Sequence, residues 1–130
     1  PENDFIAGFL GNPPIAFLDG VVADGIVEIS SAEIKIPLPE NIEVPPTESR
    51  IRVGIRPEFY QPENPYKIPG TVSFVEIQGR ENLYDIQLKD GNLLRSIQSA
   101  TVSPLSPGTK VDWGVRPEQL LFFNSSGKRL

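Results

Sequence analysis

Two stretches of this sequence repeat one motif: RVGIRPEFY at residues 52–60 and DWGVRPEQL at residues 112–120. Each copy places a Gly, an aliphatic residue, Arg, Pro and Glu after alternating apolar and polar residues. Alternation of this kind predicts a β-strand with one buried face. The apolar residues that correspond between the two copies, and that we expect to point inward, are Ile51 and Val111, Val53 and Trp113, and Ile55 and Val115.

The end of the motif predicts a corner. A Pro disfavours the helical conformation in the residue before it, so each Arg is expected to stay extended to the end of its strand. Pro also suits the first position of a helical turn, where the negative charge of the following Glu is favourable. The Gly before the corner permits a sharp bend or a close backbone approach. A second interpretation is open, in which Arg56 and Arg116, both predicted to point outward, bind an anion or a partner carboxylate.

The chain around the two motifs is also predicted to form strands. From Asp19 onward apolar residues alternate with polar ones, and turn signals recur about every eight to twelve residues, which is typical of a sandwich or barrel. Pro-rich segments at 37–49 and 61–70 are expected to be loops, because Pro cannot join the middle of a ladder. The expected strands cover residues 20–24, 26–30, 33–38, 50–56, 71–77, 82–88, 93–100, 109–116 and 120–123.

Local signals predict three details of these strands. Asp24-Gly25 is expected to join a hairpin, and the KDGN segment at 89–92 is expected to form a two-residue hairpin turn. Val72 and Phe74 are expected to share one face. Val75 and Ile77 are then out of phase, which indicates either a bulge or a pair of residues buried on both sides.

The first residues are predicted to form a short helix that Asn3 or Asp4 can cap and that the GNPP segment at 11–14 ends. Its apolar face packs either on the domain's own sheet or against a preceding domain. We expect this helix and a linker over residues 1–18 and a β-barrel domain over residues 19–130. The apolar residues that share one face of the helix are Phe5, Ile6, Phe9 and Leu10.

Composition argues against several classes of function. The net charge is -5, with 12 basic and 17 acidic residues, which argues against a nucleic-acid surface. The chain has no Cys for thiolate chemistry and no His for a general base or a metal. No P-loop and no GxSxG nucleophile elbow is present. The apolar runs are far shorter than the roughly 20 residues of a membrane span, and no secretory signal is visible. Because Met is absent even at position 1, we expect a domain cut from a longer protein.

Several segments, in this order, resemble one family. They are FIAGFLGNPPIAFLDG at 5–20, IPLP at 36–39, VGIRPEFY at 53–60, GTVSFVEIQGRENLYDIQL at 70–88 and PGTKVDWGVRPEQLLFFNSSGKRL at 107–130. Together they resemble the C-terminal regulatory region of the ATP-binding subunits of ABC importers of the maltose and glycerol-phosphate type, an OB-fold-like TOBE domain. The chain departs from the family at Phe59 and Gln78, where His and Leu are common, and these differences bear on fine specificity rather than on the fold.

The resemblance implies an all-β, OB-fold-like small β-barrel that regulates and dimerises an ATP-binding subunit for the import of sugars or related solutes. It implies no catalytic residue, cofactor or metal site in this chain, because ATP and Mg belong to a missing ATPase domain. The implied partners are that ATPase domain, a second copy of the chain, the membrane-spanning transporter subunits and a cytoplasmic regulator. Phe5, Ile6, Phe9 and Leu10 would contact the ATPase domain. The complex would lie on the cytoplasmic face of the plasma membrane.

An alternative function is also implied. Related TOBE-like domains of molybdate transport proteins bind oxyanions, so the chain is alternatively a small-ligand or oxyanion-binding module. The candidate residues for that role are Arg56, Arg116 and the SSGK turn at 125–128. Nucleic-acid binding by an OB-like barrel needs aromatic stacking platforms on a basic face, which the acidic composition disfavours.

Overall fold

A computed structural model describes residues 15–101 and 103–130 and contains, within them, nine β-strands and two single-turn 3-10 helices. No α-helix occurs in this described part of the chain, which confirms the all-β prediction. The elements are β1 (Ala16–Ala23), β2 (Ile26–Ile29), β3 (Ile34–Pro37), β4 (Arg50–Ile55), η1 (Pro57–Phe59), β5 (Tyr66–Ile77), β6 (Glu81–Gln87), β7 (Leu93–Ser99), β8 (Lys110–Val115), η2 (Pro117–Gln119) and β9 (Leu121–Asn124).

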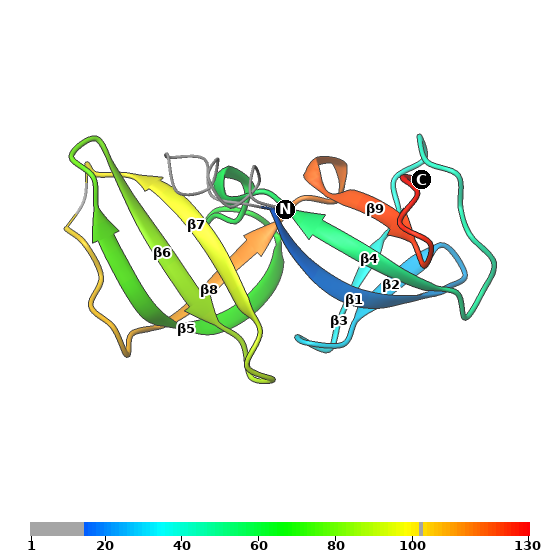
Figure 1. The fold of residues 1–130 in the computed structure, drawn as a ribbon, viewed down its shortest axis with the longest axis horizontal. Helices are drawn as coiled ribbons and strands as arrows, with labels where there is room; N and C mark the ends of the chain where they lie inside the picture. Colours follow the sequence, from blue (N-terminus) through cyan, green and yellow to red (C-terminus); the bar gives the residue numbers. More distant parts are fainter. Residues whose placement is uncertain (1–14, 102) are drawn as a thin grey trace.

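The strands form two antiparallel sheets that lie side by side (Figure 1). Sheet A has the order β3-β2-β1-β4-β9, and sheet B has the order β7-β6-β5-β8. Each sheet is strongly curled, and β4 and β8 run toward the middle of the molecule from opposite sides (Figure 1). The predicted N-terminal helix, with Phe5, Ile6, Phe9 and Leu10, lies outside the described residues.

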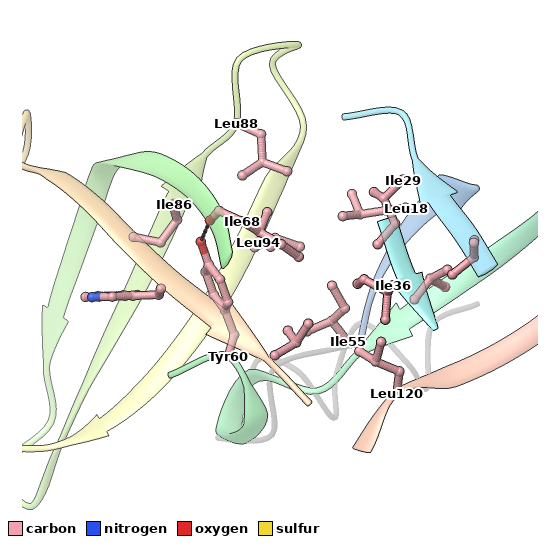
Figure 2. Close-up of a cluster of buried hydrophobic side chains, with 14 of the residues drawn as sticks. Leu18, Ile29, Ile36, Ile55, Tyr60, Ile68, Ile86, Leu88, Leu94 and Leu120 are labelled. Atoms are coloured by element: carbon pink, nitrogen blue, oxygen red, sulfur yellow. Dashed lines mark hydrogen bonds between the residues drawn. The ribbon is translucent and has the colours of Figure 1, made fainter. Parts of the chain in front are cut away.

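One hydrophobic core joins the two sheets. Leu18, Ile36 and Ile55 come from sheet A and approach the side chains of sheet B and of Tyr60 (Figure 2). The Tyr60 hydroxyl is fully buried and donates a hydrogen bond to the backbone carbonyl of Ile68. The ring of Trp113 packs edge-on against Tyr60, with centroids 5.9 Å apart. Tyr60, Tyr84 and Trp113 therefore pack together in the buried interior against the strands of sheet B rather than forming a platform on the surface.

Both copies of the repeated motif form the predicted corner. Arg56 has φ -75° and ψ 141°, and Arg116 has φ -116° and ψ 132°, so both are extended. A Pro then opens a single 3-10 turn in each copy. The amide of Phe59 donates to the carbonyl of Arg56, and the amide of Gln119 donates to the carbonyl of Arg116, both at 3.0 Å. Both copies of the motif therefore end their strand with the same local geometry.

The repetition extends beyond the motif to a whole strand pair. β1 pairs with β4 so that Gly20 lies opposite Ile51, and β5 pairs with β8 so that Gly70 lies opposite Val111. A Cβ atom on Gly20 would lie 2.5 Å from Val27 Cγ2, and one on Gly70 would lie 2.4 Å from a Cγ2 atom of β6. Gly20 and Gly70 therefore occupy matching positions and allow the next strand, β2 or β6, to pack closely in each half. The two motifs belong to different sheets, since β4 is in sheet A and β8 is in sheet B.

The half of the molecule built on sheet A and the half built on sheet B exchange chain segments at the two corners. After η1 the chain crosses to sheet B, where Gln61 pairs with Gly114 of β8. After η2 the chain crosses to sheet A, where Leu121 pairs with Gly54 of β4. A Cβ atom on Gly114 would lie 2.4 Å from the carbonyl oxygen of Asn64, so this glycine accommodates the backbone that arrives from the other half. A Cβ atom on Gly54 would lie 3.1 to 3.3 Å from side-chain atoms of Ile15, Phe17 and Leu121, which is tight but less restrictive.

Strand β5 differs in two ways from the prediction. The bulge is present between Val72 and Phe74, but it turns Phe74 outward, where half of this residue is exposed, so the expectation that both share a face is wrong. β5 also begins at Tyr66, inside the predicted 61–70 loop. Pro69 is accommodated because it pairs only with β8, while pairing with β6 begins at Thr71.

The two predicted hairpins are both present. Asp24 and Gly25, with φ 52° and 76°, join β1 to β2 as expected. The β6–β7 connection is longer than the predicted two-residue turn. β6 ends at Gln87 and β7 begins at Leu93, and the hydrogen bond from the Leu88 amide to the Asn92 carbonyl encloses the residues between them. Gly91, with φ 92°, supplies the left-handed residue within it.

Candidate functional site

The two motif arginines occupy matching corners but have different surroundings. Arg116 Nε donates to Asn64 Oδ1 at 3.0 Å, and Asn64 Nδ2 donates to the carbonyl of Phe59 at 2.8 Å. Because Asn64 is buried, this chain of hydrogen bonds ties Arg116 to the η1 corner. Arg56 is half-buried, and among the described residues no hydrogen bond or ion pair joins it to Arg116. Arg116 thus has a structural contact, and anion binding by the pair stays a prediction.

The SSGK turn uses its donors internally. The side-chain oxygen of Asn124 accepts hydrogen bonds from the Ser126 amide, the Ser126 hydroxyl and the Lys128 amide at 2.8 to 3.0 Å. The amide of Leu130 then donates to the carbonyl of Phe122. This turn therefore fixes the C-terminal residues along β9.

The most distinctive surface is the solvent-facing side of sheet A, which we call the sheet A outer face. Phe17, Val21 and Ile26 lie on it and are 40%, 37% and 39% exposed. The rings of Phe17 and Phe123 pack edge-to-face with centroids 5.6 Å apart, and the Arg52 guanidinium lies 4.7 Å from the Phe17 ring centroid. Such a stacked cation and aromatic pair is one of the favourable arrangements for a surface arginine.

Two hollows indent this face. One has a volume of about 160 Å³ and is lined by Phe17, Arg52, Phe123 and Gly127. The other has a volume of about 260 Å³ and extends over β1, β2 and β3 around Val21. An apolar face with hollows can receive side chains of another protein, because both shape and burial favour contact.

The other half of the molecule shows that the fold does not require this apolar face. In sheet B the residue opposite Gly114 is Lys67, where sheet A has Phe17 opposite Gly54. In the same way Thr71 occupies the position of Val21. The fold therefore does not require apolar side chains at the positions of Phe17 and Val21, and their presence favours a contact surface.

The charges of the sheet A outer face are balanced. Asp19 lies opposite Arg52 across β1 and β4, and Glu28 lies opposite Lys35 across β2 and β3. The whole chain, in contrast, has a net charge of -5. Two acidic molecules repel each other least where their facing surfaces carry both signs. This face is therefore suited to contact with another acidic protein surface.

The β2–β3 turn of sheet A contacts the β6–β7 turn of sheet B, and we call this contact the turn clasp. Asn92 Nδ2 donates to Ser31 Oγ at 2.9 Å, and Lys89 forms an ion pair with Glu33. The hydrogen bond and charge of Lys89 lower the pKa of Glu33, and the hydrogen bond from Ser31 lowers the pKa of Asp90. These groups connect corresponding turns of the two halves, so their role is structural.

The described residues contain no cluster of three or more acidic residues that could hold a metal ion, and the sequence has neither His nor Cys. Among the residues the structure describes, no helix has the length and apolar character needed to cross a bilayer.

Sequence reasoning did not identify the sheet A outer face. Phe17 falls in the predicted helix and linker over residues 1–18, and not in a predicted strand. The available signal was phase, because Phe17 and Val21 alternate with the buried Leu18 and Val22. Nothing in one sequence shows, however, that the outward residues of β1 come next to Phe123, which is far away along the chain.

Comparison with known proteins identifies relatives for most of the chain. The chain is 32% identical over 125 residues to a trehalose/maltose import ATP-binding protein of Thermococcus litoralis, covering 86% of this chain and 33% of the relative. It is 29% identical to an sn-glycerol-3-phosphate import ATP-binding protein of Paracoccus denitrificans, covering 100% of this chain and 36% of the relative. The chain thus spans about a third of the length of these curated relatives.

A solved structure confirms the fold. The cytoplasmic molybdate-binding protein ModG matches with a TM-score of 0.65 over 86% of this chain and 94% of that chain, at 12% sequence identity. At that identity the likeness concerns the fold alone, and it agrees with the predicted OB-fold-like small barrel. Residues 53–123, which include both copies of the repeated motif, match the TOBE domain. Since this match covers more than half of the sequence, the chain belongs to the TOBE domain family.

Proposed function

We propose that this chain is the regulatory and dimerisation domain of the ATP-binding subunit of an ABC importer for sugars or related solutes. The TOBE match and the import ATP-binding relatives support the assignment to such a subunit. The observation that carries a contact role is the apolar, charge-balanced outer face of sheet A.

In this proposal the chemistry lies elsewhere in the parent protein. ATP and Mg bind to an ATPase domain, which Phe5, Ile6, Phe9 and Leu10 would contact. That domain engages membrane-spanning subunits at the cytoplasmic face of the plasma membrane, and a cytoplasmic regulator acts on the β-domain. A second copy of this chain is the partner that the sheet A outer face is proposed to meet.

The first test is self-association measured by sedimentation equilibrium. We expect a concentration-dependent dimer, which Phe17→Ser or Ile26→Thr weakens by about tenfold, because each removes part of the apolar contact. Phe74→Ser is the matched control, since Phe74 is half exposed on sheet B, away from this face. A monomer at every concentration, or an equal effect of Phe74→Ser, would contradict the dimer contact.

The second test addresses the parent subunit. Calorimetry of this chain with Mg-ATP is expected to show no binding, and the gene is expected to encode a P-loop upstream of Pro1. An open reading frame without that loop would refute the assignment to an ATP-binding subunit.

A further inference from the structure

A cavity with a volume of about 370 Å³ lies where the β2–β3 turn of sheet A meets sheet B. This volume lies within the usual range for small-molecule sites, about 300 to 1,000 Å³. We call it the junction pocket. Its lining residues are Ser31, Ala32, Pro69, Gly70, Thr71, Gln87, Leu88, Lys89, Lys110 and Val111.

The pocket has an apolar part and a polar row. Leu88 is buried, and together with Val111 and Pro69 it offers carbon surface. Thr71 pairs with Gln87 on β6 and with Lys110 on β8, so these three side chains form one row across the strands. A ligand in the pocket can therefore contact hydrocarbon on one side and hydrogen-bonding groups on the other.

The charge of the pocket is opposite to that of the chain. Its lining holds two lysines and no Asp or Glu, although acidic residues outnumber basic ones in the sequence. Lys89 is partly neutralised by its ion pair with Glu33 at the rim. Lys110 is exposed and has no carboxylate partner among the described residues. Within the described residues, the pocket therefore combines the unpaired charge of Lys110 with the charge of Lys89, which is paired with Glu33.

The corresponding place in sheet A lacks this character. Val21 pairs with Glu28 as Thr71 pairs with Gln87, so a glutamate stands where the pocket has a neutral amide. Asp19 lies opposite Arg52 as Pro69 lies opposite Asp112, so this carboxylate is on β1 in sheet A but on β8 in sheet B, where it does not line the pocket. The two halves share a backbone pattern, and the residues that line the pocket in the sheet B half include two lysines and no carboxylate.

We propose that the junction pocket binds a small organic anion of about the size of a hexose phosphate. Its phosphate or carboxylate group contacts Lys110, with Lys89 beside it, and its carbon skeleton covers Leu88 and Val111. Thr71 and Gln87 hydrogen-bond its hydroxyl groups. An inorganic oxyanion alone would leave the apolar part of the pocket uncovered, so binding energy from that surface would be lost. This inference does not depend on the proposed role in an importer.

The ligand class is tested by titration calorimetry of this chain with glucose 6-phosphate, gluconate, glucose, inorganic phosphate and molybdate. We expect at least one of the first two to bind about tenfold more tightly than glucose and than either inorganic anion. Whichever of the two binds better tells whether the anionic group is a phosphate or a carboxylate. Binding of inorganic phosphate or molybdate that equals or exceeds that of both organic anions, or no binding by either organic anion, would overturn the proposal.

The location is tested with exposed residues, so that the fold is preserved. Lys110→Ala is expected to weaken binding about tenfold, because a hydrogen bond to a charged group is lost. Gln87→Glu adds a carboxylate at nearly constant shape and is expected to weaken binding at least as much. Lys128→Ala, an exposed lysine outside the pocket, is the matched control and should bind as the wild type does.

An equal loss with Lys128→Ala would indicate non-specific charge attraction and overturn the site. Thermal melting of each variant separates lost binding from lost folding. Phe17→Ser, which tests the sheet A contact, is expected to keep full anion affinity. Failure of the dimer proposal and failure of the pocket proposal are therefore distinguishable in the same set of proteins.

Discussion

Single residues decide how closely the strands of each half approach one another. Gly70 has no room for a side chain, because a Cβ atom would lie 2.4 Å from Ile86 Cγ2 and 2.9 Å from the carbonyl oxygen of Gln87. Neither neighbour can withdraw easily, since Ile86 is fully buried and the carbonyl belongs to the backbone of β6. The glycine is thus required by tertiary packing and not by its backbone dihedral angles.

Gly70→Ala is expected to lower the free energy of unfolding by about 1–3 kcal/mol through overpacking. Urea denaturation measures it, with Ser99→Ala, an exposed change on β7, as a control within about 0.5 kcal/mol of the wild type. A stability unchanged by Gly70→Ala would mean that β5 and β6 separate at little cost.

Tyr60 combines a buried ring with one hydrogen bond. Tyr60→Phe removes the donor to the carbonyl of Ile68 and is expected to cost about 1–2 kcal/mol at neutral pH. Burial, and then the charge of Asp112, raise the pKa of Tyr60 above its ordinary value. Above about pH 10 the unfolded chain therefore loses this proton before the folded chain does, and stability falls.

The pH dependence gives the Tyr60 prediction a second measurement. Urea midpoints between pH 8 and about pH 11 should decline more steeply for the wild type than for Tyr60→Phe. The other two tyrosines, Tyr66 and Tyr84, are present in both proteins, so their contribution cancels. Parallel declines would show that Tyr60 ionises equally easily in both states.

At the scale of elements, the turn clasp holds together two hairpin ends that correspond in the two halves. The folded state lowers the pKa values of Glu33 and Asp90. Their contribution to stability is therefore present above their ordinary pKa values and is lost as the pH falls through the lowered ones. Both carboxyl groups are solvent-exposed, so the effect is expected to be small and sensitive to salt.

The clasp is tested with Glu33→Gln combined with Asp90→Asn. The variant is expected to be slightly less stable than the wild type at pH 7, and the difference should shrink steadily as the pH falls below the ordinary pKa values of the two carboxyl groups. Thermal melting at low ionic strength measures both values. A difference that persists at low pH would show that the two side chains act through something other than their charge.

At the scale of the whole molecule, the two sheets depend on each other. The segment after each corner pairs with a strand of the other half, at Gly114 and at Gly54. The buried cluster is also continuous, since Ile55, Tyr60 and Leu120 lie at the junction (Figure 2). Sheet A needs β9, which follows η2, and neither half can complete the shared core alone.

One cooperative unfolding transition is therefore expected for the whole chain. In differential scanning calorimetry the calorimetric and van't Hoff enthalpies should agree. Residues 66–119 expressed alone keep the four strands of sheet B but should remain unfolded, because they lack Tyr60 and the sheet A side of the core. Two separable transitions would contradict this interdependence.

The sequence by itself determined the local features of this protein: the strands, the two corners, the bulge and the Asp24-Gly25 hairpin. Their causes are short-range, since alternation selects a strand face, Pro fixes a dihedral angle, and Asp-Gly suits a tight turn. Family resemblance extended these features to the OB-fold-like barrel. Pro69 and Phe74 were misplaced because their environment depends on where pairing with β6 starts.

Only the tertiary structure decided how the repeated motifs are used. It placed them in different sheets, crossed the chain between the halves at Gly54 and Gly114, and brought Phe123 beside Phe17. These arrangements depend on hydrogen bonds and packing between residues far apart in the chain, whose pairing no local pattern specifies. The apolar outer face of sheet A and the junction pocket arise from that long-range pairing.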